Sequence, residues 1–149
     1  NNFKRIVQTD DHVMILIEMI HDARVVRMNG AHAAKGVHKW MGDSVGWWDG
    51  DTLVVDTTNF TNKTNFNGSQ DNLHLVERFE RVASDLIMYK VTVEDPTVWT
   101  QAWTVEIPLT QVDNRRNQIF EAACHEGNYG MTNILSGARA RDEQAAESK

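Results

Sequence analysis

The chain has 149 residues, of which 15 are Lys or Arg, 21 are Asp or Glu, and one is Cys. Its formal charge of −6 argues against nucleic acid as a partner, because proteins that bind nucleic acid present basic surfaces. A single Cys excludes an internal disulfide framework and a zinc site built on several cysteines. The sequence lacks an apolar run of roughly 18 residues, the length that predicts a membrane-spanning helix. These features are typical of one globular domain formed by residues 1–149.

Alternation of apolar and polar residues predicts a succession of β-strands along most of the chain. Turn-forming residues separate the strands, and residues 30–46 and 61–72 are polar loops. The expected strands are residues 4–9, 12–19, 23–29, 46–48, 52–60, 73–82, 86–95, 98–109 and 118–124. The connections after residue 73 are too short for parallel crossovers, so we expect an antiparallel meander.

The apolar spacing changes near the C-terminus. Met131, Ile134, Leu135 and Ala138 are spaced as on one face of a helix, which predicts one helix after Asn128. Residues 139–149 form a polar tail that we expect to be the fraying end of this helix. The fold predicted is therefore all-β, a lipocalin-like barrel with one C-terminal helix. A β-sandwich is the alternative, because it uses the same alternation.

Two carboxylates lie on apolar strand faces. Glu77 alternates with Leu75 and Phe79, and burial there would raise its pKa, as a general acid or base requires. The other interpretation is an ion pair with Arg24, Arg27 or another basic side chain. Glu18 lies among apolar residues whichever face of its strand is inside, so we include it among the candidate ligand-binding residues.

His21 and Asp22 end a predicted strand at a turn, where a His beside a carboxylate can be an oriented base. The alternative is a turn-capping Asp next to a His with a structural role. His125 and Glu126 lie where the last predicted strand meets the helix and form a second candidate acid–base pair. There the alternative is a helix-start motif with Asn128 as its N-cap.

The loop at residues 30–46 contains the densest set of polar side chains. His32, His38, Trp40, Asp43 and Ser44 fall within it. One interpretation is a barrel-mouth loop in which His38, Trp40, Asp43 and Ser44 contact a ligand. The other is a turn that Asp43 and Ser44 stabilise through their own side chains.

The five Trp residues are a further candidate feature. Trp99 and Trp103 share a strand face, where they either line a ligand pocket or fill the core. Cys124 alternates with Phe120 and Ala122, which suits a buried, unreactive thiol. The six His residues show no spacing typical of a metal site, so no metal ligands and no cofactor are predicted.

Several motifs together resemble a family of uncharacterised secreted proteins that are abundant in soil and aquatic bacteria. The motifs are EMIHDARVVRMNGAH (18–32), WMGDSVGWWDGDTLVVDTTNF (40–60), LHLVERFERV (73–82), YKVTVEDPTVWTQAWTVEIP (89–108) and FEAACHEGNYGMTNILSGAR (120–139). The resemblance implies a periplasmic or secreted protein and a longer precursor, of which this chain is the C-terminal part. It also draws attention to seven candidate site residues, namely His21, Asp22, Asp43, Ser44, Glu77, His125 and Glu126. It implies no specific reaction.

The resulting functional hypothesis is a secreted barrel that binds a small, largely apolar or cyclic molecule. Its carboxylates and imidazoles would give acid–base chemistry without a cofactor, as in an isomerase, a lyase or a hydrolase. One alternative is a non-catalytic interaction module, as a homo-oligomer or as a subunit of a larger assembly. A second alternative is a metalloprotein that uses the His residues.

Overall fold

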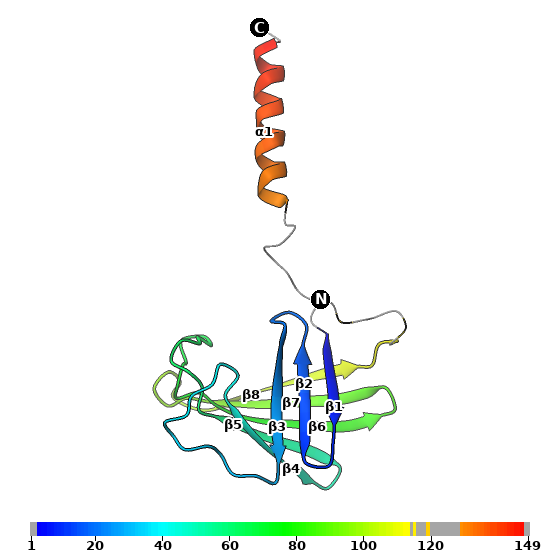
Figure 1. Cartoon of the computed structure of the whole chain (residues 1–149), viewed down its shortest axis with the longest axis vertical. Coiled ribbons are helices and arrows are strands. Elements are labelled where there is room, and N and C mark those ends of the chain that lie inside the picture. Colours follow the sequence, from blue (N-terminus) through cyan, green and yellow to red (C-terminus); the bar gives the residue numbers. More distant parts are fainter. Residues whose placement is uncertain (1–2, 114, 116–118, 120–128, 148–149) are drawn as a thin grey trace.

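A computed structural model describes residues 3–113, 115, 119 and 129–147. Eight strands form one sheet in which each strand pairs with the next along the chain (Figure 1). The strands are β1 (Lys4–Gln8), β2 (His12–Ile17), β3 (Asp22–Met28), β4 (Asp43–Asp49), β5 (Thr52–Thr58), β6 (His74–Ala83), β7 (Leu86–Glu94) and β8 (Trp103–Thr110). The sheet curls into a half-barrel, which confirms the predicted all-β, barrel-like fold.

One strand pair differs from the predicted meander. β3 and β4 are parallel, whereas the other neighbouring pairs in the described sheet are antiparallel. A parallel pair needs a connection of about a dozen residues or more, and residues 29–42 are long enough to return the chain to the starting end of the sheet. This connection, called the 29–42 loop below, is central to the candidate site.

The core lies where the sheet folds over itself. Figure 1 shows β1, β2 and β3 crossing β6, β7 and β8 at a steep angle. Val13, Ile15 and Val26 from the first group of strands pack with Phe79 of β6 and with Val55 of β5. A second cluster forms around Phe60, Leu73 and Val93. The face that carries these residues is called the inner face, and the opposite face is called the outer face.

The last predicted strand of the meander begins later than expected. The sequence predicts a strand from residue 98, but β8 begins at Trp103. Asp95 accounts for the difference, because its side chain accepts a hydrogen bond from the Thr97 amide (2.9 Å) and its carbonyl accepts one from Trp99 (2.9 Å). These local bonds stabilise a turn in place of the strand. The strand predicted at residues 118–124 lies outside the described residues, apart from Ile119.

The C-terminal helix is present as predicted. α1 spans Gly130–Glu147, so it includes most of the tail that was expected to fray. Figure 1 shows this helix projecting away from the sheet. In the described part of the chain, no helix is both long enough and apolar enough to cross a membrane.

The first and last strands have one edge each that pairs with no other described strand. A groove of about 920 Å³ lies between these edges. Residues of β1 line one side, including Lys4 and Arg5, and Pro108 and Leu109 of β8 line the other.

Candidate functional site

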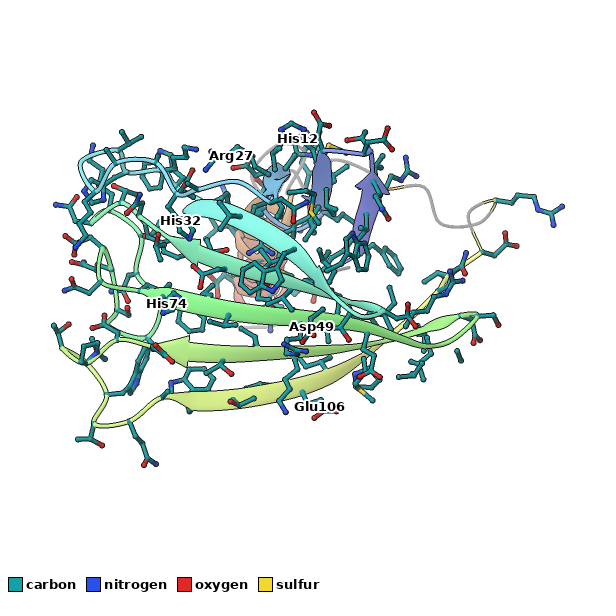
Figure 2. All side chains as sticks on the ribbon, turned by 90° about the horizontal axis from the view of Figure 1, so that it is seen from below. His12, Arg27, His32, Asp49, His74 and Glu106 are labelled. Carbon is teal, nitrogen blue, oxygen red and sulfur yellow. The ribbon has the colours of Figure 1, made fainter. Side chains whose placement is uncertain are left out.

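A row of alternating carboxylates and imidazoles crosses the outer face. His32 Nε2 lies 2.8 Å from one oxygen of Asp56, and His74 Nε2 lies 2.8 Å from the other. The second nitrogen of His32 faces Asp43 at 3.3 Å, and the second nitrogen of His74 faces Glu94 at 3.1 Å. We call these five residues the charge ladder. In Figure 2, His32 and His74 lie toward one end of the strands and Asp49 toward the other.

The register of the sheet brings the ladder together. Asp56 pairs with Val76, and His74, two residues before Val76, is on the same face. His74 pairs directly with Glu94. His32 is not on a strand, and the 29–42 loop brings it over the outer face. Residues from four strands and one loop thus form one hydrogen-bonded row.

Asp43 forms the buried end of the ladder. Its side chain is fully buried and accepts hydrogen bonds from both terminal nitrogens of Arg27 (3.1 and 2.9 Å) and from Lys39 Nζ (2.6 Å). The Ala33 amide also donates to it, at 2.8 Å. Burial alone would raise the pKa of Asp43, but these hydrogen bonds and the charge of Arg27 outweigh burial and lower its pKa. Asp43 is therefore a fixed negative charge that holds the 29–42 loop on the sheet.

The partners of His32 and His74 determine where the ring protons lie. An ionised carboxylate only accepts hydrogen bonds, so a ring nitrogen that faces one must donate. Both nitrogens of each ring face carboxylates, and only a protonated imidazolium donates from both. Burial by itself lowers the pKa of His74, but hydrogen bonds and negative charges from Asp56 and Glu94 outweigh burial and raise its pKa. While these hydrogen bonds are in place, neither nitrogen of these two rings presents a lone pair to a substrate.

A pocket of about 450 Å³ lies beside the ladder, between the 29–42 loop and the segment that enters β6. Eight of its ten lining residues have polar side chains. The residues are His32, Ala33, Lys35, His38, Thr58, Asn59, Asp71, Asn72, Leu73 and His74. The pocket is therefore suited to a ligand that offers hydrogen-bonding groups.

His38 differs from the other two imidazoles of this pocket. Its Nδ1 lies 2.7 Å from the carbonyl oxygen of Phe60, which can only accept, so Nδ1 carries the proton. In the neutral ring, Nε2 then has a lone pair, and no described residue donates a hydrogen bond to it. His38 is thus an oriented imidazole with a nitrogen available to accept a proton in a polar pocket.

Backbone bonds hold the segment around His38 in place. The Lys39 amide donates to the Asn59 carbonyl (3.0 Å), and the Thr61 amide donates to the Lys39 carbonyl (3.0 Å). Asn59 has a left-handed φ of 56°, a conformation that Asn tolerates better than most residues, and its side chain donates to the Ala33 carbonyl (3.1 Å). Asn59 thereby connects both halves of the loop to the end of β5.

Four predicted ligand-binding residues lie on or next to the 29–42 loop, but they do not share one environment. His38 lines the pocket, and Asp43 belongs to the ladder. Ser44 is on the inner face, where its hydroxyl lies 2.8 Å from the Thr57 hydroxyl. Trp40 is 60% exposed. Of these four, only His38 lines the pocket, and Asp43 lies at the buried end of the ladder beside it.

Glu77 lies in the core and not at the pocket. Its two oxygens accept from Arg24 at 2.6 and 2.9 Å, and Tyr89 donates to it at 2.7 Å. Burial and the adjacent Glu77 carboxylate raise the pKa of the Tyr89 hydroxyl. The Glu77 carboxylate thus forms the ion pair with Arg24 that was one of its two interpretations.

The remaining predicted acid–base residues are not joined to Glu77. Glu18 is buried and accepts from the Phe3 amide at 3.2 Å, which fastens the start of the chain to the end of β2. His21 is an exposed turn residue with a φ of 49°, and Asp22 accepts from the Ala23 amide at 2.7 Å. Among the described residues, no hydrogen bond links His21 to Glu77. His125 and Glu126 lie outside the described residues, as does Cys124.

Trp99 and Trp103 pack against each other and against Phe66. Their ring centroids are 5.6 Å apart in an edge-to-face arrangement, and Phe66 stacks on Trp103 at 6.2 Å. Both Trp side chains are half-buried against the Phe60 cluster. Their main contribution in this structure is therefore packing at one end of the sheet.

Asp56, His74 and Glu94 are not among the site residues predicted from the sequence. Alternation places Asp56 on the outer face of β5, but it says nothing of its cross-strand neighbours. Counting back from the Ala83–Leu86 pair would place His74 opposite Asp95, whereas a bulge between Arg81 and Ala83 moves the register by one residue. The sequence does have His74 and Glu94 near the two ends of one hairpin. The bulge shifts the register by one residue, so their pairing cannot be counted from the turn.

The described residues contain no group of three or more His, Cys, Asp or Glu side chains arranged to hold a metal ion. Comparison with known proteins found no matching family model, no matching curated protein and no matching solved structure. Any function proposed for this chain therefore rests on the geometry of the pocket.

Proposed function

We propose that the polar pocket binds a small molecule and that His38 accepts or donates a proton in its transformation. The observation that carries the proposal is the 2.7 Å bond from Nδ1 of His38 to the Phe60 carbonyl, which leaves Nε2 as the basic nitrogen of a ring that lines the pocket. A backbone acceptor that fixes the tautomer and orientation of an imidazole is a common feature of catalytic histidines.

The lining of the pocket favours a polar substrate over the apolar one that the sequence suggested. Asn59, Asn72 and Thr58 provide amide and hydroxyl groups for orientation. Lys35 adds a positive charge that can stabilise an anion formed when a proton is removed. Proton transfer of this kind supports an isomerisation, an elimination or a hydrolysis with groups of this chain alone. A secreted or periplasmic location remains part of the proposal and rests on the sequence resemblance.

The proposal can be tested by nuclear magnetic resonance on the purified protein. A panel of sugars, hydroxy acids and nucleosides is added, and backbone amide shifts are followed together with any change in the added compound. We expect shifts confined to residues 32–38, 58–59 and 71–74. We also expect nitrogen shifts of the His38 ring that report the Nδ1-protonated tautomer.

His38→Gln is the decisive variant, because Gln keeps a polar side chain but has no nitrogen that accepts a proton. It should retain ligand-induced shifts and lose turnover of any compound that the wild type converts. His12→Gln is the matched control, since His12 is a surface residue whose ring nitrogen contacts Asp11. Shifts that cluster elsewhere, or full turnover in His38→Gln, would contradict the proposal.

A further inference from the structure

One residue, His32, belongs both to the charge ladder and to the pocket beside it. His32 contributes to the pocket wall together with Ala33 and Lys35, and it is also the member of the ladder that comes from the 29–42 loop. The other four members are on strands β4, β5, β6 and β7. His32 therefore connects the loop that forms this wall to the sheet beneath it.

One part of the attachment of this wall depends on a doubly protonated ring. With both nitrogens donating, His32 bridges Asp43 and Asp56. A neutral ring has one donor, so one of its two nitrogens would present a lone pair to an ionised carboxylate. Losing the proton thus turns one attraction into a repulsion, and the ring can no longer bridge both acids.

We propose that His32 is a positioning residue that tightens the pocket wall at residues 31–35 when protonated and loosens this wall when it loses its proton, while the bonds of Ala31 to Arg27 and of Ala33 to Asn59 remain. This inference deepens the function proposed above, because it makes binding at that pocket dependent on pH. The base itself is not released, since His38 keeps its own bond to the Phe60 carbonyl and Lys39 keeps its backbone bonds to Asn59 and Thr61.

Charged groups on every neighbouring element act on this ring. Asp43 and Asp56 contact it directly, one at each ring nitrogen. Arg27, Lys39 and His74 bind the same two acids and compete for their charge. Three further charged groups lie nearby, namely Glu94 beyond His74, and Lys35 and Asp71 in the pocket lining.

The direction of the pH dependence follows from linkage. A His whose pKa is raised by folding stabilises the folded form fully below its ordinary value of 6.5, and this stabilisation is lost as the pH rises through the folded value. The raised pKa of His74 places that loss above pH 6.5 for the contacts of His74 with Asp56 and Glu94. For His32 the sign follows from geometry: the bridge between Asp43 and Asp56 needs both ring protons, so the wall should be held more tightly in acidic solution and loosen as the pH rises.

Hydrogen exchange of the ligand-free protein measures this opening directly. Exchange is recorded between about pH 5.5 and pH 9, a range that brackets the ordinary imidazole value, and is corrected for the intrinsic effect of pH. We expect protection of the Ala33 amide, which donates to Asp43, to fall by up to about tenfold per pH unit for each proton released. The Lys39 amide should stay protected throughout and serves as an internal control.

Three variants separate the effect of the His32 proton from the effects of the neighbouring imidazoles. His32→Gln has one amide nitrogen in place of two donors at opposite edges of a ring, so protection of Ala33 should be low at every pH. His74→Gln leaves the contacts of His32 in place and should keep Ala33 protected in mildly acidic solution. His12→Gln should behave as the wild type, because its ring lies on β2 beside Asp11.

Constant protection of Ala33 in the wild type across the pH range would overturn the inference. So would pH-dependent protection that persists in His32→Gln. The wild-type pH series decides the matter even if His32→Gln fails to fold. Because no ligand is present, these results are independent of whether His38 transfers protons, and failure of one proposal leaves the other open to its own test.

Discussion

Glu77 shows how a single carboxylate is accommodated in the core. It is 3% exposed and is bound by Arg24 and Tyr89, so all three polar groups lose water together. Arg24 Nε is the one buried side-chain nitrogen or oxygen without a partner among the described residues. Buried ion pairs of this kind are sensitive to removal of one member, because the other charge is then left uncompensated.

We expect Glu77→Gln to lower the free energy of unfolding by about 3 kcal/mol, the low end of the cost of breaking a buried pair. Urea denaturation followed by Trp fluorescence measures the loss. The control is the triple variant Arg24→Met, Glu77→Leu, Tyr89→Phe, which removes all three polar groups and should cost less than Glu77→Gln. A free energy of unfolding for Glu77→Gln within about 0.5 kcal/mol of the wild type would show that the charge pair does not stabilise the fold.

The contrast between Glu77 and His74 shows what a sequence can reveal about single residues. Glu77 stood out because alternation placed a carboxylate between Leu75 and Phe79. His74 did not stand out, because its importance comes from Asp56 and Glu94 on neighbouring strands. Residues whose partners lie across a sheet become visible only when the register is known, and the bulge in the β6–β7 hairpin changes that register.

At the scale of elements, the 29–42 loop is the feature that departs most from the prediction. The strands beside it were predicted within a few residues, because alternation marks them clearly. The parallel pairing of β3 with β4 was not predicted, since alternation carries no information on strand direction. A loop rich in Gly, Ala and His gave no periodic signal, yet it brings His32 and His38 to the pocket.

Gly42 is the last residue of this loop, and a substitution there tests how closely the loop packs. It has a φ of +71°, and a Cβ there would lie 2.6 Å from Thr57 Cγ2 and 2.9 Å from the Phe60 ring. Gly42→Ala should therefore combine backbone strain with a steric clash next to Asp43. Gly50→Ala is the matched control, because Gly50 has a φ of +60° with open space around it.

Gly50→Ala should lower the free energy of unfolding by about 1 kcal/mol, the cost of a left-handed conformation. Gly42→Ala should cost at least about 2 kcal/mol more, a typical penalty for overpacking. Guanidinium denaturation of both variants provides the comparison. Equal losses in the two variants would mean that Thr57 and Phe60 move aside without penalty.

At the scale of the whole molecule, the sheet and α1 behave as separate parts. The core clusters consist of residues from the strands and the loops between them. On α1, Ile134 is 67% exposed and Leu135 is 49% exposed, so the helix presents its apolar side chains to solvent. The sequence predicted this helix from its spacing, and that spacing contained no information on whether the apolar stripe would pack against the sheet.

Removal of residues 130–149 should leave the urea midpoint of the sheet unchanged, because the described core does not include the helix. The midpoint can be followed by Trp fluorescence, since all five Trp residues lie before residue 104. Trp103→Ala in the full chain is a positive control that should lower the midpoint through the Phe60 cluster. A lower midpoint in the truncated chain would indicate that the helix stabilises the sheet.

The two strand edges beside the groove are sites where two molecules could pair edge to edge in solution. Lys4 and Arg5 place positive charge along β1, and Pro108 removes one amide donor from β8. Like charges keep two such edges apart only over the screening distance, which shortens from about 10 Å at 0.1 M salt to about 3 Å at 1 M. We therefore expect concentrated salt to weaken the electrostatic part of this protection against edge-to-edge growth, whereas the part that Pro108 provides is independent of salt.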